Sequence, residues 1–248
     1  MAMNIAPPAQ LDFAHDLVKA TIDPAFFTGC AFVCIDMQDG GPQEPISEED
    51  LHEEWRAMGF TVEDVNNAYD YAWGVALPNA AKVARECSAV GIPRVFAHWG
   101  FQFPDGMDLD PVVRSKMLRQ HGSDFSKWPG HIAHPGAKPA SCFDIQPTDY
   151  VLPKTSQDAF ASSTLHFVLA NLRVRNLIFV GGHTEACLCK TALTAKRLGY
   201  TTLCVEDATS NARESSRFHG ILGSEFDFVV TAETLLHALQ SARDLVGK

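Results

Sequence analysis

The sequence predicts an α/β fold built on one mostly parallel sheet of six strands, with helices covering both faces. Short apolar runs recur along the chain without strict alternation of polar and apolar residues, which is typical of strands buried on both sides. Segments with amphipathic helical spacing separate these runs. The 248 residues, 46% of them hydrophobic, are enough for one large domain with a substantial core and are few for two. We therefore expect a single domain over residues 1–248.

The strands and helices are expected in an alternating order that suits a parallel sheet. Six apolar runs are expected to be strands: residues 30–35, 93–97, 149–153, 176–182, 201–206 and 226–231. Four segments of the second half are expected to be helices: residues 163–172, 185–198, 213–222 and the stretch from 233 onward. Gly199 directly follows one of these helices and is a plausible stop for it.

Two long loops, near residues 39–66 and 100–147, interrupt this alternation of strands and helices. The first is acidic and carries Gly-Gly-Pro at its start, and the second is rich in Pro and Gly. Loops of this length in a compact domain usually act as lids, substrate walls or subunit contacts. Insertions without any such role are about equally common, so the sequence leaves both interpretations of these loops open.

The composition argues against several classes of function. The formal net charge is −10 and the 20 Lys and Arg residues are scattered, so nucleic acid is not expected as a partner. No run of about 18 apolar residues and no signal peptide is visible, so no membrane association is expected. The seven cysteines form no C-x-x-C pair, and an odd count without a secretion signal favours a reducing, cytoplasmic setting.

Polar or reactive residues stand where several expected strands end. Asp36 ends the first strand, Lys154 follows the run at 150–153, and the sequence GGHTEAC at 181–187 joins a strand to a helix. A fourth strand ends at Glu206 and Asp207, which are expected to be structural. Because ligands of open parallel sheets bind beyond the carboxyl ends of the strands, these residues mark the expected site.

Cys187 is the candidate nucleophile of this site. The N–H groups and dipole at a helix N-terminus lower the pKa of a thiol, and a thiolate there attacks a carbonyl. A packing cysteine is the alternative, and position alone favours that reading. Asp36 and Lys154 form either a catalytic pair or a buried ion pair that holds the sheet together. The convergence of a base, a cation and a nucleophile favours a catalytic role.

Three separated stretches resemble the isochorismatase-like cysteine hydrolase family. They are IDMQ at 35–38, KTSQDAF at 154–160 with Thr164 and Leu165 beyond it, and LIFVGGHTEAC at 177–187. The resemblance extends over about residues 30–240, with a poor fit in the two long loops. It implies a three-layer Rossmann-like fold, a homodimer or homotetramer, and a triad carried by Asp36, Lys154 and Cys187.

The same resemblance implies the details of the turn before Cys187. A cis peptide is expected between Gly182 and His183, and the backbone N–H groups of His183 and Cys187 are expected to form the oxyanion hole. His183 stands where relatives usually have a small residue such as Ala. Its imidazole either touches substrate or fills space beside the turn, and both alternatives stay open.

The presence of Cys187 favours the amidohydrolase branches of this family, because true isochorismatases cleave a vinyl ether and lack the nucleophilic cysteine. Nicotinamidases carry an Asp-x-His metal motif after the first strand, whereas the first histidine beyond Asp36 is here His52. No metal and no other cofactor is therefore expected. His131 and His134 resemble a metal pair, but histidines in a polar loop are more often solvated or subunit-contact residues.

We therefore expect a cysteine-dependent amidohydrolase that cleaves the C–N bond of a small non-peptide amide or ureide through a thioester and releases ammonia or an amine. It resembles the metal-free enzymes that act on biuret, triuret, ureidoacrylate or N-carbamoylsarcosine. Three alternatives remain: an isochorismatase-type ether hydrolase that does not use the cysteine, a nicotinamidase-like amidase, and a catalytically silent binding protein of the same fold.

Several residues are candidates for binding the small-molecule substrate. They follow strand ends or belong to the family motif, and they are Gln38, Trp99, Phe160, His183, Arg213, Arg217 and His219. The last three follow the strand that ends at Asp207 and would meet a substrate carboxylate or carbonyl. Ordinary charges on a helix surface are the alternative for at least two of them.

Overall fold

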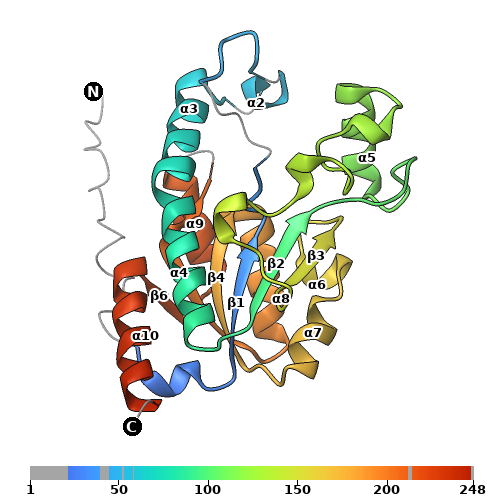
Figure 1. Cartoon of the computed structure of the whole chain (residues 1–248). Coiled ribbons are helices and arrows are strands. Elements are labelled where there is room, and N and C mark those ends of the chain that lie inside the picture. Colours follow the sequence, from blue (N-terminus) through green and yellow to red (C-terminus); the bar gives the residue numbers. More distant parts are fainter. Residues whose placement is uncertain (1–21, 40–44, 52, 58, 212–213, 247–248) are drawn as a thin grey trace, which may run out of the picture.

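The computed structural model describes the chain except residues 1–21, 40–44, 52, 58, 212–213 and 247–248. Its centre is one six-stranded sheet in the order β3-β2-β1-β4-β5-β6, and every neighbouring pair is parallel (Figure 1). The strands are β1 (Cys30–Ile35), β2 (Arg94–Trp99), β3 (Tyr150–Lys154), β4 (Asn176–Gly182), β5 (Thr201–Ser210) and β6 (Phe228–Val230). The predicted α/β fold class is confirmed.

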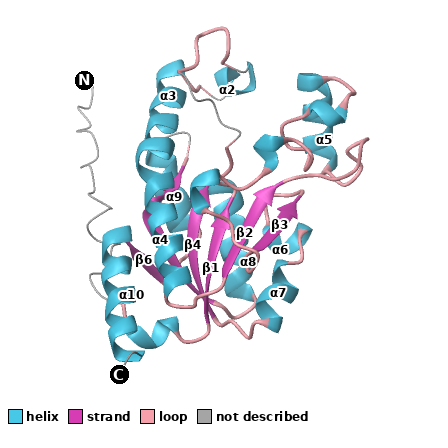
Figure 2. Cartoon of the chain, viewed as in Figure 1, coloured by secondary structure: helices cyan, strands magenta, loops and turns pink. Residues whose placement is uncertain are grey.

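The central strand β1 shows why the sheet is covered on both faces. All six of its residues are buried, and its even-numbered side chains join one apolar cluster with α4 (Leu77–Ala89) and α10 (Ala232–Val246). Its odd-numbered side chains join a second cluster with α7 (Leu165–Asn171) and α8 (Cys189–Arg197). Figure 2 shows these helices in two layers with the sheet between them. Among the described residues, no helix is both long and apolar enough to cross a bilayer.

The two segments expected to be long loops contain helices of their own. Segment 39–66 holds α2 (Glu53–Ala57) and the start of α3 (Val62–Tyr71), and segment 100–147 holds α5 (Pro111–His121) and three 3-10 turns. Capping residues explain why helices begin there. Thr61 accepts from the backbone of Asp64 in a capping box, and Asp110 caps α5. The helices α2, α3 and α5 lie beyond the carboxyl ends of the strands (Figure 1).

The helix α3 does not end at Tyr71 but continues into α4. A π-helical turn, Ala72–Ala76, joins the two without a break in the helical backbone. The resulting rod over residues 62–89 packs on the sheet through α4, and its α3 half rises beyond the strand ends (Figure 1). The remaining helices are α6 (Ala159–Ser162) and α9 (Glu214–Gly223).

The strand β5 runs further than expected. Its pairing with β4 shifts register between Phe179 and Gly181, because residues 205–208 bulge out of the ladder before pairing resumes at Thr209. The Thr209 hydroxyl donates to the carbonyl of Glu206 within this bulge. The sequence predicts that this strand ends at Glu206. In the structure it continues to Ser210, at the edge of the sheet where the site lies.

Candidate active site

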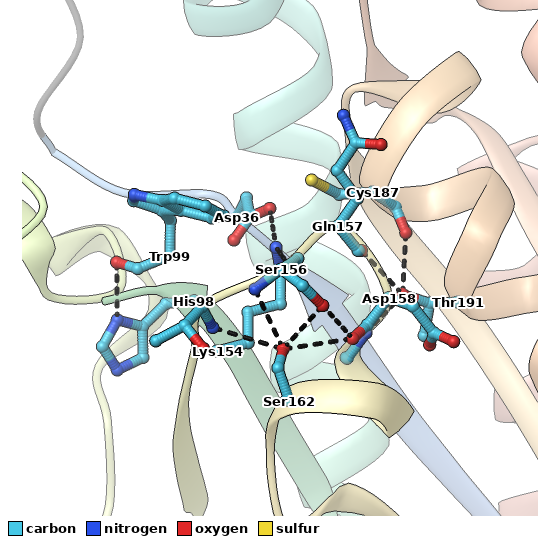
Figure 3. Close-up of polar contacts among 12 residues, drawn as sticks. Asp36, His98, Trp99, Lys154, Ser156, Gln157, Asp158, Ser162, Cys187 and Thr191 are labelled. Atoms are coloured by element: carbon cyan, nitrogen blue, oxygen red, sulfur yellow. Dashed lines mark hydrogen bonds and ion pairs between the residues drawn. The ribbon is translucent and has the colours of Figure 1, made fainter. Parts of the chain in front are cut away.

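Asp36 occupies the first position after β1 and turns away from the strand direction. Its φ of 54° lies in the left-handed region, which Asp tolerates better than most residues. Its N–H donates to the carbonyl of Ala97 on β2 at 2.9 Å, which fixes the turn beside the neighbouring strand. Its Oδ2 lies 2.7 Å from the Nζ of Lys154 (Figure 3). Two of the predicted triad residues are therefore in direct contact.

Lys154, at the end of β3, is fully buried and is surrounded by electron-rich groups. Its Nζ also donates to the carbonyl of Ser156 at 3.1 Å and lies 5.1 Å from the centre of the Trp99 ring. Burial alone would lower the pKa of Lys154, but the charge of Asp36 and the nearby Cys187 outweigh it and raise the pKa. The lysine is therefore held as a cation inside the protein.

Cys187 lies in a second π-helical turn, Thr184–Leu188, between β4 and α8. The pKa of its thiol is raised to about 12; burial is the largest cause, the charge of Asp36 adds to it, and Lys154 opposes both. The expectation that the helix N-terminus lowers this pKa is wrong for the resting site, because desolvation and a neighbouring carboxylate dominate. Asp36, Lys154 and Cys187 are thus close enough to interact with one another, and Figure 3 shows the sulfur beside Asp36. The structure therefore places all three expected triad residues together. The resting group is a thiol.

The turn before Cys187 depends on two glycines. Gly181 has a φ of 114°, and a Cβ on it would lie 2.0 Å from the carbonyl oxygen of Ile35 on β1. A Cβ on Gly182 would lie 2.7 Å from the hydroxyl of Ser210. The peptide between Gly182 and His183 is cis, at the place that the family resemblance implied. The glycine pair is needed because two neighbouring strands approach this backbone closely.

A hydroxyl ties the Cys187 turn to the segment that follows Lys154. Thr191 on α8 donates from Oγ1 to the carbonyl of Cys187 at 2.7 Å and accepts from the N–H of Ala159 at 3.1 Å. The Ser162 hydroxyl in turn accepts from the N–H groups of Thr155 and Ser156. The turn that carries Cys187 and the segment that follows Lys154 are therefore joined by hydrogen bonds beside the triad (Figure 3).

A cavity of about 350 Å³ opens over this site. Asp36, Gln38, Trp99, Gly182 and His183 are among the residues that line it. Its size falls within the range of about 300–1,000 Å³ that small-molecule sites usually have. Three of the expected substrate-binding residues, namely Gln38, Trp99 and His183, thus border the cavity.

His183 is the exposed member of a short polar chain. Its Nδ1 lies 3.1 Å from Oδ1 of Asn211, and the side-chain amide of Asn211 donates to the hydroxyl of Thr184 at 3.0 Å. Since Asn211 lies one residue after β5, this chain links the turn of β4 to the end of the neighbouring strand. The imidazole is oriented by its neighbours rather than merely filling space beside the turn.

The other expected binding residues lie elsewhere. Phe160 packs on Tyr200, with ring centres 6.0 Å apart, and does not line the cavity. Arg217 is buried in an ion pair with Glu206 at 2.7 Å, so its guanidinium serves the fold rather than substrate. His219 is exposed on α9 and lines none of the described cavities. Arg213 lies outside the described residues.

The strand-end pair Glu206 and Asp207 is structural, as expected. Glu206 receives Arg217, and Asp207 accepts from the N–H of Ala232 at 2.6 Å and from the side-chain amide of Asn79 at 3.1 Å. Burial raises the pKa of Asp207. Through these contacts, the bulge of β5 is held against the helices α4, α9 and α10.

His131 and His134 cap their own loop. The Nδ1 of His131 accepts from the N–H of Ala133 at 3.2 Å, and that of His134 accepts from Gly136 at 3.1 Å. Within the described part of the chain, no group of three or more His, Cys, Asp or Glu side chains is close enough to hold a metal ion.

The expected site omitted one wall of the cavity. Tyr69, Trp73 and Leu77 line it from the rod formed by α3, the π-helical turn and α4, and Met117 lines it from α5. The signal was present in the sequence, since the three residues of the rod recur every fourth position, as on one face of a helix. The acidic composition of residues 39–66 favours a loop there and obscures the start of the helix that carries this face.

Solved structures share this fold. A cysteine hydrolase from Pseudomonas syringae pv. phaseolicola is 18% identical with a TM-score of 0.67, over 91% of this chain and 98% of that one. N-carbamoylsarcosine amidase from Thermoplasma acidophilum is 18% identical with a TM-score of 0.58, over 83% of this chain and 97% of that one. At such identities the likeness establishes the architecture alone.

Curated relatives match a shorter part of the chain. Ureidoacrylate amidohydrolase RutB from Variovorax paradoxus is 41% identical over 64 residues, which are 26% of this chain and 25% of the relative. The same-named protein from Klebsiella pneumoniae is 30% identical over 105 residues, 40% of this chain and 44% of the relative. The chain thus spans less than half the length of these relatives. The Isochorismatase domain family, in contrast, matches residues 30–234, and the protein belongs to that family.

Proposed function

We propose that this protein is a cysteine-dependent amidohydrolase that cleaves the C–N bond of a small non-peptide amide or ureide. The observation that carries this proposal is the 2.7 Å ion pair between Lys154 and Asp36 beside the thiol of Cys187, next to a cavity that Asp36 itself lines together with Gly182 and His183. A carboxylate, an ammonium and a thiol in mutual range supply a base, a counter-charge and a nucleophile. The names of ureidoacrylate amidohydrolase and N-carbamoylsarcosine amidase support an amide-type bond.

The first half of the reaction forms a thioester. Asp36 takes the proton of the Cys187 thiol as the sulfur attacks the carbonyl carbon of the substrate. Because the thiol pKa is about 12, this transfer takes place during the attack rather than before it. The backbone N–H groups of His183 and Cys187 stabilise the oxyanion, and Lys154 offsets the negative charge that builds up beside Asp36. Asp36 then protonates the nitrogen, the C–N bond breaks, and ammonia or an amine leaves.

The second half restores the enzyme. Asp36 takes a proton from a water molecule, whose oxygen attacks the thioester carbon. The C–S bond breaks, the carboxylic or carbamic acid is released, and the proton on Asp36 returns to the sulfur. No redox partner enters either half, because every step exchanges only protons and a nucleophile.

The test is ammonia release from a panel of amides by a matched pair of cysteine variants. The panel contains nicotinamide, biuret, triuret, N-carbamoyl amino acids and simple aliphatic amides. We expect Cys187→Ala to lose at least about a thousandfold in kcat, as removal of a nucleophile does. The control, Cys189→Ala, removes a free thiol two residues away and is expected to stay within about twofold. Near-normal turnover by Cys187→Ala would reject the mechanism.

Three further expectations from the sequence are also part of the proposal. A homodimer or homotetramer is implied only by the family resemblance, and analytical ultracentrifugation measures it directly. The reducing, cytoplasmic setting rests on the odd cysteine count, and cell fractionation tests it. The extent of the single domain is tested by limited proteolysis.

A further inference from the structure

The helical rod over residues 62–89 presents an apolar wall to the cavity. Tyr69 comes from α3, Trp73 from the π-helical turn and Leu77 from the start of α4, and all three line the cavity. Single π-helical turns inside longer helices are frequent at functional sites. Here Ala72 and Trp73 of the turn line the cavity, whereas Ala76 packs in the core against the sheet.

The opposite wall is apolar as well, because its polar groups are used internally. The Nε2 of Gln38 donates to the carbonyl of Trp99 at 3.0 Å, and its Oε1 accepts from the N–H of Trp99 at 3.0 Å. Gln38 also donates to the carbonyl of Gly136 at 3.3 Å. This amide therefore fixes Trp99 and the segment around Gly136, and its hydrogen-bonding capacity is largely consumed. Met37 and Met117 add further apolar side chains to the lining of the cavity.

The charge balance of the cavity disfavours an anionic substrate. None of the described residues that line it is a Lys or Arg, and Asp36 is the one carboxylate among them. The charge of Lys154 is paired with Asp36 and covered by the ring of Trp99. The protein as a whole carries a formal net charge of −10. Apart from the imidazole of His183, the described lining gives an entering carboxylate no cationic group in exchange for its lost hydration.

From these walls and charges we infer that the substrate is an uncharged amide or ureide that carries an apolar, ring-sized group. This inference rests on the proposed function, since it assumes that the scissile carbonyl lies over Asp36 and Cys187. The apolar group packs among Tyr69, Trp73 and Trp99, where aromatic faces give favourable contacts beyond simple burial. Ureidoacrylate and N-carbamoylsarcosine, which name the relatives, both carry a carboxylate, so this chain differs from those relatives in substrate class.

Two matched ligand pairs test the inference separately for charge and for the apolar group. N-carbamoylglycine and N-carbamoylglycinamide differ only in whether the far end is a carboxylate or a neutral amide. Acetamide and benzamide differ only in the apolar group. Binding is measured by calorimetry and by quenching of tryptophan fluorescence with the Cys187→Ala protein, which does not turn the ligands over. We expect the neutral member and the ring-bearing member each to bind at least about tenfold more tightly.

A substitution that installs a cation provides a gain-of-function test. Met117→Arg adds a guanidinium to the cavity wall, whereas Met107→Arg makes the same change at a position that is 65% exposed and lies outside the cavity. We expect Met117→Arg to raise kcat/KM for N-carbamoylglycine about tenfold and Met107→Arg to leave it unchanged. An equal gain from both variants, or from neither, would contradict a cavity that lacks a cation.

The outcomes separate this inference from the proposed function. Wild-type protein that prefers N-carbamoylglycine to its neutral amide, while Cys187→Ala is inactive, would overturn the inference and leave the proposed function intact. Protein that binds benzamide more tightly than acetamide but hydrolyses no member of the panel would support the inference about the cavity and reject the proposed function. Equal affinity for acetamide and benzamide would overturn the inference.

Discussion

Asp36 presents its two carboxylate oxygens to different surroundings. Oδ2 accepts the ion pair from Lys154, whereas Oδ1 is buried and makes no hydrogen bond of ordinary geometry with the part of the chain that the structure describes. A buried carboxylate oxygen without a donor is costly to maintain. In the proposed mechanism this oxygen is the one that accepts the thiol proton, which explains why it is kept.

The first prediction concerns the charge of Asp36. Asp36→Asn removes the negative charge that raises the pKa of Cys187, while Lys154 remains to stabilise a thiolate. We expect alkylation of Cys187 by iodoacetamide at pH 8 to become about tenfold faster, and turnover to fall at least a hundredfold because the proton carrier is lost. Peptide mapping by mass spectrometry follows Cys187 separately from the other thiols. Asp39→Asn, three residues on and exposed, is the control, and slower alkylation in Asp36→Asn would contradict the assigned cause.

The second prediction concerns the backbone before the nucleophile. Gly181→Ala puts a Cβ 2.0 Å from the carbonyl oxygen of Ile35, in addition to its unfavourable φ. Gly199→Ala also has a positive φ, of 87°, but its Cβ meets nothing within 4 Å. We expect the control to cost about 1 kcal/mol in the free energy of unfolding and Gly181→Ala to cost well over ~3 kcal/mol, as measured by urea denaturation. Equal costs would contradict the close approach of β1 and β4.

At this scale the sequence predicted the reactive residues better than the binding residues. Asp36, Lys154 and Cys187 could be found because each follows a strand or a strand–helix turn, and parallel strands end at one edge. Phe160 and Arg217 were misplaced because nothing local distinguishes a pocket side chain from one that packs on Tyr200 or pairs with Glu206. Such partners are distant in sequence and are brought close only by the fold.

Among the elements, α8 is linked to the segment that follows Lys154 by several side chains, and the Thr191 hydroxyl is the one that also contacts the Cys187 backbone. Thr191 satisfies the buried N–H of Ala159 and holds the carbonyl of Cys187. We expect Thr191→Val to lower the free energy of unfolding by about 1–3 kcal/mol, because that N–H is left unsatisfied, and to lower kcat more than it changes KM. Thr201→Val at the far end of β5 is the control. Unchanged kcat in Thr191→Val would show that this link does not position the nucleophile.

The elements that the sequence did not predict well are those whose limits depend on partners. The part of β5 that reaches Ser210 is a strand because it pairs with β4 again after a bulge. No local sequence pattern predicts such a bulge. The start of α3 was available from its capping box at Thr61, but the acidic composition of residues 39–66 favoured a loop. Because that helix is not predicted, the expected site also lacks the residues Tyr69, Trp73 and Leu77 that line the cavity.

At the scale of the whole molecule, thiols buried in the core set a limit to alkaline stability. Burial raises the pKa of Cys30, Cys34, Cys87 and Cys204 above the ordinary value of 9.0. Above pH 9 the unfolded chain therefore loses protons that the folded chain keeps, so stability falls as pH rises. Each such thiol contributes ~1.4 kcal/mol per pH unit in this range. We expect the urea midpoint under reducing conditions to be steady from pH 7 to 8.5 and to drop steeply above pH 9.

This alkaline limit has a matched control in the same core. Cys87→Ala removes one titrating thiol from α4 and is expected to make the decline above pH 9 less steep, although the variant is less stable at neutral pH. A wild-type midpoint that stays level up to pH 11 would contradict the burial of these thiols.

The architecture as a whole was predictable because its signals are repeated along the chain. Each buried strand is an apolar run, and each crossover helix separates two of them, so errors at single boundaries did not change the fold class. The cavity was not predictable, because it is enclosed by segments whose shape depends on long-range contacts such as that of Gln38 with Gly136.

The most direct test of the assigned nucleophile is the intact mass of the enzyme quenched with acid during turnover of an amide that releases ammonia in the panel. We expect a population heavier by the acyl or carbamoyl group of that substrate, and peptide mapping to locate the added mass on Cys187. Steady turnover without any adduct on that peptide, and with full activity retained in Cys187→Ala, would contradict the assignment.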